Sequence, residues 1–277
     1  METPESIALE NIAIEQAYER ARKMLTREAI NLKQFKGLYG EDVVKRDEKY
    51  VKEMEARFSR ANAANWKQAR MLAAIFEAVF HECAELSDWL GPEALTIKTS
   101  RFDDIRNGVD SVAEFRESDV SASYIALAID VTISAEAIEK FKRIREEIEK
   151  GKLAKVKYFI SEHTNIRGEL SKIPRVVIGA DAKTIKELGE LWLEKNNKIL
   201  ENHPVQFQVL EEISSQLNAF QRYAEKVNQS MLVAVYSKMH GLVQKISKEK
   251  SSSVSDSGYR DSVFYSFQGY LKNFSSL

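Results

Sequence analysis

The spacing of hydrophobic positions divides the chain into helical and extended parts. Residues 1–62 contain little Gly or Pro, and apolar residues recur there at helical spacing, as in Ile14, Tyr18, Ala21 and Leu25. A further helix is predicted over residues 63–90, where the segment "WLGP" supplies a Gly-Pro stop. Its apolar stripe consists of Leu72, Ile75, Phe76, Val79, Phe80, Cys83 and Leu86. This last helix is therefore expected to pack on the elements that follow it.

The hydrophobic period changes after residue 93. The segments "ALTIKTS", "VDSVAEF" and "YIALAIDVTI" predict a meander of three strands, with a turn at "DDIRNG" between the first two. A helix is predicted to begin with Ser134 as its N-cap and to stop at Gly151. Two more strands, "AKVKYFI" and "PRVVIGA", and a helix over residues 182–200 follow. This order predicts a mixed sheet covered by helices on both faces.

The C-terminal part carries a heptad-like stripe. Its apolar positions alternate at spacings of three and four, and they are Leu210, Ile213, Leu217, Phe220, Ala224, Val227 and Met231. The stripe predicts one long amphipathic helix over residues 203–248. Such a helix either docks on its own domain or forms a coiled coil, so a homodimer through it stays open. Residues 249–277 begin as a polar segment that we expect to be flexible, although "VFYSFQGYLKNF" is aromatic enough to dock on the chain or on a partner.

These patterns divide the chain into four parts. They are an N-terminal helical region (1–62), a core (63–202), the long helix (203–248) and the tail (249–277).

Composition limits the classes of function. With 277 residues, 44% hydrophobic and 30% charged, the chain resembles an ordinary soluble protein and is not disordered throughout. A net charge of -1 gives no global attraction to nucleic acid or anionic membranes, so polyanion binding would need a local basic patch. No apolar run approaches the roughly 18 residues that span a bilayer, and the first residues lack the features of a signal peptide. We therefore expect a cytoplasmic protein without a membrane partner.

The single cysteine excludes a disulfide or a cysteine-based zinc cluster within one chain. Cys83 lies in the apolar stripe of a predicted helix, where a buried structural thiol is expected.

Two aspartates occupy unusual positions in the predicted strands. Asp130 is the first acid in a strand otherwise suited to burial, and Asp110 stands at the head of the preceding strand. If the turn between these strands is centred near residue 120, antiparallel pairing places Asp110 opposite Asp130. Their Cβ atoms would then lie about 4.5–5.5 Å apart. A slip of one residue in the register would remove this arrangement.

Two ionised carboxylates at this distance repel each other. Either the pKa of one carboxyl must be raised, or a cation must lie between the two. Mg²⁺, held by one or two carboxylates together with water and a phosphate oxygen, meets this requirement.

The order of the predicted elements and the positions of the two aspartates resemble the PD-(D/E)XK nuclease superfamily. The resemblance covers roughly residues 70–160: a helix, a meander with Asp110 heading its second strand, Asp130-Val131-Thr132 near the end of its third, then a helix and a strand. It implies an α/β fold with a restriction endonuclease-like core, here with an N-terminal helical extension and a long C-terminal helix. It also implies an endonuclease or exonuclease that uses Mg²⁺ or Mn²⁺, with DNA favoured over RNA as its nucleic-acid partner.

The resemblance assigns roles to the residues of the motif. Asp110 becomes the first metal ligand, Asp130 the second and the Val131 carbonyl a third. Thr132 stands where the family has its lysine and cannot supply a cation. Some members carry that lysine on the following helix, where we prefer Lys140 as the substitute, with a solvated surface lysine as the alternative.

A glutamate on the first helix often completes the site in this family. Glu82, on the rim of the apolar stripe, is preferred over Glu77, which is expected to point away. Asp103 and Asp104 could also join the site, although acids in such a turn usually serve the turn itself.

A local surplus of basic residues between 140 and 157 could contact phosphates. The expected nucleic-acid contacts are Lys142, Arg143, Lys155 and Lys157, and the alternative is a solvated helix face.

The leading hypothesis is thus a metal-dependent nuclease with Asp110, Asp130 and Lys140 in catalysis. Thr132 favours a second hypothesis, a catalytically inactive nuclease-like domain that binds nucleic acid or a protein partner. In a third, a helical interaction protein uses both aspartates for local hydrogen bonding. The sequence contains no GxGxxG, GxxxxGK[ST], HExxH or GxSxG motif.

Overall fold

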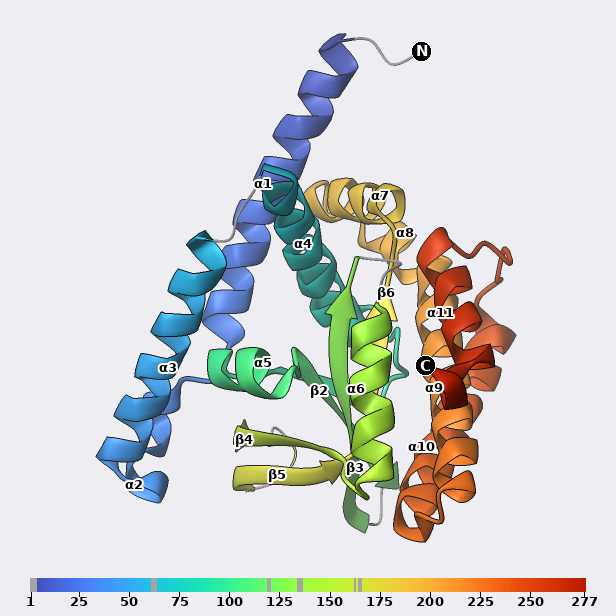
Figure 1. The fold of residues 1–277 in the computed structure, drawn as a ribbon. Helices are drawn as coiled ribbons and strands as arrows, with labels where there is room; N and C mark the ends of the chain where they lie inside the picture. Colours follow the sequence, from blue (N-terminus) through green and yellow to red (C-terminus); the bar gives the residue numbers. More distant parts are fainter. Residues whose placement is uncertain (1–3, 61–63, 119–120, 134–136, 162, 164–165) are drawn as a thin grey trace.

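The computed structural model describes residues 4–60, 64–118, 121–133, 137–161, 163 and 166–277, and it has a mixed α/β fold (Figure 1). The N-terminal elements are α1 (Pro4–Glu28), η1 (Leu32–Phe35), α2 (Lys36–Tyr39), α3 (Glu41–Arg60) and α4 (Ala64–Leu86). The described residues up to Leu86 are therefore mainly helical, as expected. Cys83 of α4 is buried, and burial raises the pKa of its thiol to about 12.

A small mixed sheet forms the centre of the molecule. Its strands are β1 (Ala94–Lys98), β2 (Ser111–Ser118), β3 (Ser121–Thr132) and β6 (Arg175–Gly179). They lie in the order β1-β2-β3-β6, with the first three antiparallel and β6 parallel to β3. The predicted meander is confirmed. Between β3 and β6 the chain forms α6 (Ile138–Glu149) and a separate antiparallel hairpin of β4 (Ala154–Ile160) and β5 (Arg167–Ile173).

Successive side chains of β2 and β3 point to opposite faces of the sheet, and both faces are covered. Ala113, Leu127 and Ile129 pack into the large core that includes α4. On the other face, Val112 and Ala128 pack against the β4–β5 hairpin. The buried residues Phe141 and Ile144 of α6 belong to the large core.

The free edge of β6 is covered by side chains of α9 (Val205–Lys226). Gln216 accepts a hydrogen bond from the Val177 N–H (2.8 Å) and donates one to the Val177 carbonyl (2.6 Å). Glu212 accepts from the Gly179 N–H (2.9 Å), and Gln208 donates to the Gly179 carbonyl (3.0 Å). Since an edge strand leaves backbone groups unpaired, these buried side chains take the place of a further strand.

The C-terminal part differs from the single helix expected over residues 203–248. The chain forms a hairpin of α9 and α10 (Ser230–Ser253), because Asn228 adopts a left-handed conformation (φ 59°) that ends the first helix. Leu210, Leu217 and Phe220 of the heptad-like stripe are buried within the chain, which is the docked alternative, whereas Met231 is exposed.

Part of the tail also forms a docked element. Asp261 caps α11 (Ser262–Lys272) by accepting hydrogen bonds from two backbone N–H groups of its first turn. Phe267 of α11 is buried and packs edge-to-face on Phe141 of α6. The aromatic segment therefore docks on its own chain instead of remaining a flexible tail.

Three other local expectations need correction. The "DDIRNG" segment is not a simple turn but belongs to α5 (Arg101–Asn107), which Ser100 caps at its start and Gly108 ends with a φ of 61°. β5 was not predicted, and the helix expected over residues 182–200 is divided into α7 (Ala182–Leu193) and α8 (Asn197–Glu201). The proposed N-cap Ser134 lies outside the described residues.

Within the described part of the chain, no helix is both long enough and apolar enough to span a membrane.

Candidate functional site

The register of β2 and β3 brings the two aspartates together. Ser111 pairs with Ile129 and Val112 with Ala128, so that paired residue numbers sum to 240, as expected. Asp110 directly precedes β2, and its N–H donates to the Ile129 carbonyl (2.9 Å). The pairing therefore places Asp110 and Asp130 at the same end of two neighbouring strands.

Asp110 is held by its neighbours in a fixed position. Its Oδ2 accepts a hydrogen bond from the Val131 N–H (2.7 Å), and its carbonyl accepts one from Lys98 Nζ (2.8 Å). Burial raises the pKa of the Asp110 carboxyl well above its usual range, and the nearby charges of Asp104, Glu77 and Asp130 raise it further. The site thus concentrates more negative charge around Asp110 than its cations neutralise.

Two further acids and one lysine complete this cluster, which we call the acid cluster: Glu77, Lys98, Asp104, Asp110 and Asp130. Glu77 of α4 forms an ion pair with Lys98 of β1 (2.8 Å), and Lys98 has only 7% of its side chain exposed. Burial alone would lower the pKa of Lys98, but Glu77, Asp104 and Asp110 raise it. Burial would raise the pKa of Asp104, but Lys98 and Arg101 lower it. Lys98 is therefore the central cation of the cluster, and it was not among the expected site residues.

The preference for Glu82 over Glu77 was wrong. Glu82 forms an ion pair with Arg20 of α1 (3.2 Å), whereas Glu77 lies against Lys98. Five residues along a helix correspond to a rotation of about 140°, so only one of the two glutamates can face the strand ends. Burial raises the pKa of Glu77 despite its lysine partner.

Lys140 reaches the site from α6. Its Nζ lies 2.5 Å from Asp130 Oδ1 and 2.8 Å from the Val131 carbonyl oxygen. The expected substitute for the missing strand lysine is thus in contact with one motif aspartate and with the carbonyl next to it. Thr132 itself is buried.

The two acids at the start of α5 have different surroundings. Asp104 pairs with Arg101 and belongs to the acid cluster. Asp103 is buried and accepts hydrogen bonds from the N–H groups of Lys157 (2.7 Å) and Tyr158 (3.0 Å), so it joins α5 to β4.

The basic residues expected to contact nucleic acid are paired with acids. Lys142 pairs with Glu139 (2.8 Å), Arg143 with Glu147 (3.4 Å) and Lys155 with Glu169 (3.7 Å). Lys157 forms an ion pair with buried Asp47 and lies near the rings of Tyr39, Phe102 and Tyr158. Lys157 therefore has a structural role. None of the four basic residues lines the cleft that Asp110 lines.

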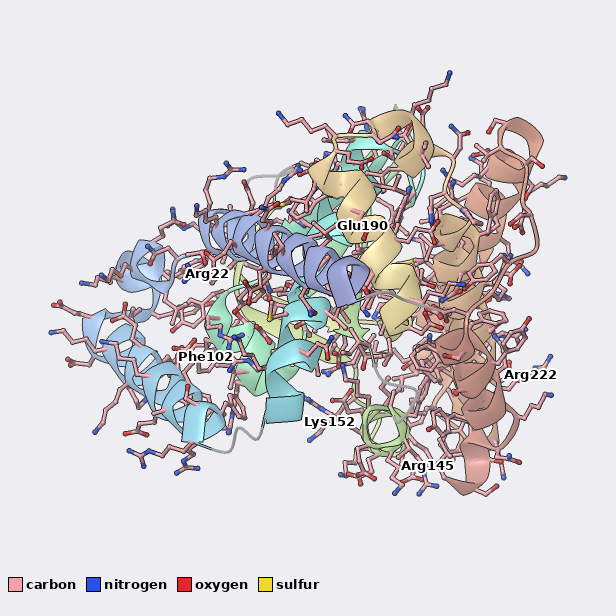
Figure 2. All side chains as sticks on the ribbon, turned by 90° about the horizontal axis from the view of Figure 1, so that it is seen from above. Arg22, Phe102, Arg145, Lys152, Glu190 and Arg222 are labelled. Carbon is pink, nitrogen blue, oxygen red and sulfur yellow. The ribbon has the colours of Figure 1, made fainter. Side chains whose placement is uncertain are left out.

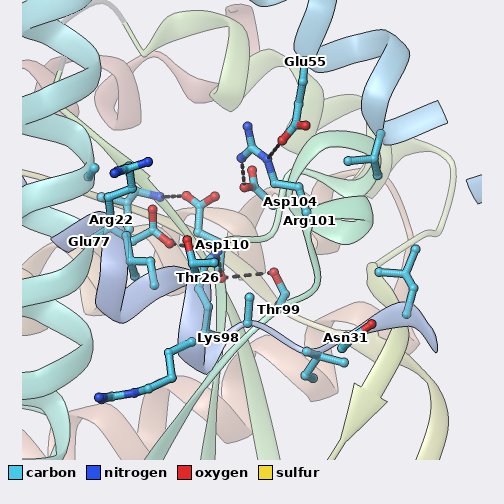
Figure 3. Close-up of a pocket in the computed structure, with 18 of the residues that line it drawn as sticks. Arg22, Thr26, Asn31, Glu55, Glu77, Lys98, Thr99, Arg101, Asp104 and Asp110 are labelled. Carbon is cyan, nitrogen blue, oxygen red and sulfur yellow. Dashed lines mark hydrogen bonds and ion pairs between the residues drawn. The ribbon is translucent and has the colours of Figure 1, made fainter. Parts of the chain in front are cut away.

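Part of the acid cluster lies on the wall of a cleft of about 1070 Å³. Glu77, Lys98, Asp104, Asp110 and Val131 line it together with residues of α1, η1, α3 and α5. Figure 3 shows the labelled Glu77, Lys98, Asp104 and Asp110 gathered around this cleft, with Arg22 and Glu55 from the N-terminal helices nearby. The cleft therefore connects solvent to the end of the strands where the aspartates lie.

The donor atoms of this site fit a hard divalent cation. Asp110 and Asp130 supply carboxylate oxygens and Val131 a carbonyl oxygen, which are the ligand types that Mg²⁺ prefers. Within the described residues, no three acid, His or Cys side chains are grouped closely enough to bind a metal as a set. Since Mg²⁺ keeps several waters and needs only one or two carboxylates, this does not conflict with a site at Asp110 and Asp130.

Comparison with protein-family models, with curated proteins and with solved structures found no match to this chain.

Proposed function

We propose that this protein is a metal-dependent nuclease that hydrolyses phosphodiester bonds of nucleic acid, with DNA favoured over RNA. One observation carries the proposal: Asp110 and Asp130 meet at one end of β2 and β3, with Lys140 in contact with Asp130, and Asp110 lies on the wall of an open cleft. The element order α4, β1-β2-β3, α6 and a strand parallel to β3 supports a restriction endonuclease-like core.

Each residue of the site would have its own role in hydrolysis. Asp110 and Asp130 would hold Mg²⁺ or Mn²⁺, which supplies a water of lowered pKa and polarises the scissile phosphate. Lys140 lies where an ammonium group can orient that water or neutralise developing charge. Glu77 and Lys98 position Asp110, because Lys98 binds both the Glu77 carboxylate and the Asp110 carbonyl.

A specific contact favours a second candidate, an inactive nuclease-like domain that binds nucleic acid. Lys140 Nζ contacts both Asp130 and the Val131 carbonyl, the oxygen that the family resemblance assigns to the metal. In this alternative the ammonium replaces the metal and no hydrolysis follows.

Cleavage assays separate the two candidates. Purified protein is incubated with single- and double-stranded DNA and RNA in Mg²⁺ or Mn²⁺, with EDTA as the control. The nuclease proposal expects chelator-sensitive cleavage of at least one substrate. Binding without cleavage in either metal would support the inactive domain instead.

A further inference from the structure

The N-terminal helices place basic side chains along the cleft that leads to the acid cluster. The residues concerned are Arg22 and Arg27 of α1, Lys33 of η1, Lys52 of α3 and Arg70 of α4. We call them the basic wall. They are far apart in sequence and come together because α1, η1, α3 and α4 all contribute residues to the lining of the cleft.

The basic wall differs from the lysine and arginine deeper in the cleft. Lys98 is paired with Glu77, and Arg101 is paired with Glu55 (2.9 Å) and Asp104. The charges of Lys98 and Arg101 are therefore neutralised by carboxylates of the protein itself. These two side chains add little attraction for a phosphate ligand.

The basic wall, in contrast, faces solvent. All five side chains are exposed, and within the described residues Lys33, Lys52 and Arg70 form no ion pair. Among the described residues, Arg22 pairs with Glu19 (2.9 Å) and Arg27 with Glu28 (2.8 Å), both within α1, and the two arginine side chains stay 59% and 77% exposed. An exposed pair of this kind contributes little free energy and is easily exchanged for a phosphate.

We propose that the basic wall binds the phosphate backbone of a nucleic-acid strand and leads it to Asp110 and Asp130. The identity of the ligand rests on the proposed function. Attraction for a polyanion must come from a local basic surface, because the protein has a net charge of only -1. The acid cluster would repel phosphates unless cations nearby offset it, and the basic wall supplies these cations at the cleft.

The basic wall gives the N-terminal region a role in binding the nucleic-acid ligand. Residues 4–60 do not merely extend the core, because α1, η1 and α3 supply four of the five residues of the basic wall. In Figure 2, Arg22 of α1 and Phe102 of α5 lie on the side of the molecule where the N-terminal helices are, and Arg222 lies on the opposite side, on the C-terminal helices. The proposed binding face is therefore separate from the C-terminal hairpin.

The test compares two triple variants that each remove three positive charges. One is Arg22→Gln/Lys52→Gln/Arg70→Gln in the basic wall. The control is Lys152→Gln/Arg222→Gln/Lys226→Gln, whose residues are exposed and do not line the cleft. Binding of labelled single-stranded DNA, duplex DNA and single-stranded RNA is measured by fluorescence anisotropy in EDTA, so that no substrate is cleaved. Circular dichroism and thermal unfolding confirm that both variants fold.

We expect the wall variant to bind its best ligand about tenfold or more weakly than the unmodified protein. The slope of log affinity against log salt, measured between about 50 mM and 200 mM, should fall by roughly 2–3. The control variant should stay within about twofold of the unmodified protein. Equal losses in the two variants, or no nucleic-acid binding by the unmodified protein at low salt, would overturn the proposal.

The outcome is separable from that of the nuclease proposal. Wall-dependent binding by a protein that cleaves nothing would uphold the basic wall and reject the enzyme. Cleavage and binding that are insensitive to the wall variant would reject the basic wall and uphold the enzyme.

Discussion

Lys140 Nζ lies 2.5 Å from Asp130 Oδ1, so a helix supplies the cation that β3 lacks at Thr132. The contact joins α6 to the end of β3 beside Asp110.

Replacing Lys140 should reduce catalysis more than folding. We expect Lys140→Gln to lower the cleavage rate by about 10²–10³-fold, the usual effect of removing one group that stabilises transition-state charge. Lys142→Gln is the matched control, because Lys142 lies on the same helix and is paired at the surface with Glu139. Single-turnover cleavage rates measure both. Equal rates for the two variants would assign Lys140 a structural role only.

Divalent metal should stabilise the protein in the absence of substrate. A ligand that binds only the folded state at ten times its Kd adds about 1.4 kcal/mol to the free energy of unfolding. For a domain of this size that corresponds to a rise in Tm of roughly 2–4 °C. Thermal unfolding with Mg²⁺ or Mn²⁺ should show this rise for the unmodified protein and not for Asp110→Asn. A rise of the same size in both would place the metal elsewhere.

The pH dependence of stability should reflect the raised pKa of Asp110. A carboxyl whose pKa is higher in the folded state stabilises the fold below its unfolded pKa and loses this contribution as pH rises through the folded pKa. Asp110→Asn removes the titration, so the variant should gain stability relative to the unmodified protein as pH rises. Chemical denaturation near pH 5 and near pH 8, without metal, measures this difference. A difference that does not change with pH would contradict the crowding of charge around Asp110.

The side chains that cover the edge of β6 should matter for stability. Gln216→Leu leaves the Val177 N–H and carbonyl without their partners in the core, and it should cost about 2–6 kcal/mol. The control Gln221→Leu, on the outer side of the same helix, removes only an exposed hydrogen bond to Glu225 and should change stability by about 0.5 kcal/mol or less. Urea denaturation compares the two. Similar costs would indicate that α9 does not replace a missing strand.

The sequence was sufficient for the central part of the site because its signals there are local. Apolar alternation in β2 and β3 fixes which residues face the core, and a short turn fixes the register, so the pairing that places Asp110 beside Asp130 could be predicted. Lys140 could be placed because its helix follows β3 almost directly.

Other parts of the site depend on contacts between distant segments. The stripe of α4 indicates which positions are apolar, but the choice between Glu77 and Glu82 depends on α1, which covers Glu82 through Arg20. In the same way, Arg22, Lys52 and Arg70 meet at the cleft only through tertiary packing. The end of α9 at Asn228 could not be predicted from the sequence, because the heptad-like stripe continues past this residue.

The most direct test of the central claim is the cleavage activity of Asp130→Asn on the best substrate of the unmodified protein. Asparagine has nearly the same shape as aspartate, so the fold should persist by circular dichroism while the carboxylate that would bind the metal is lost. We predict that metal-dependent cleavage is abolished and that binding in EDTA is retained. Cleavage by Asp130→Asn at the rate of the unmodified protein would contradict the assignment of this site.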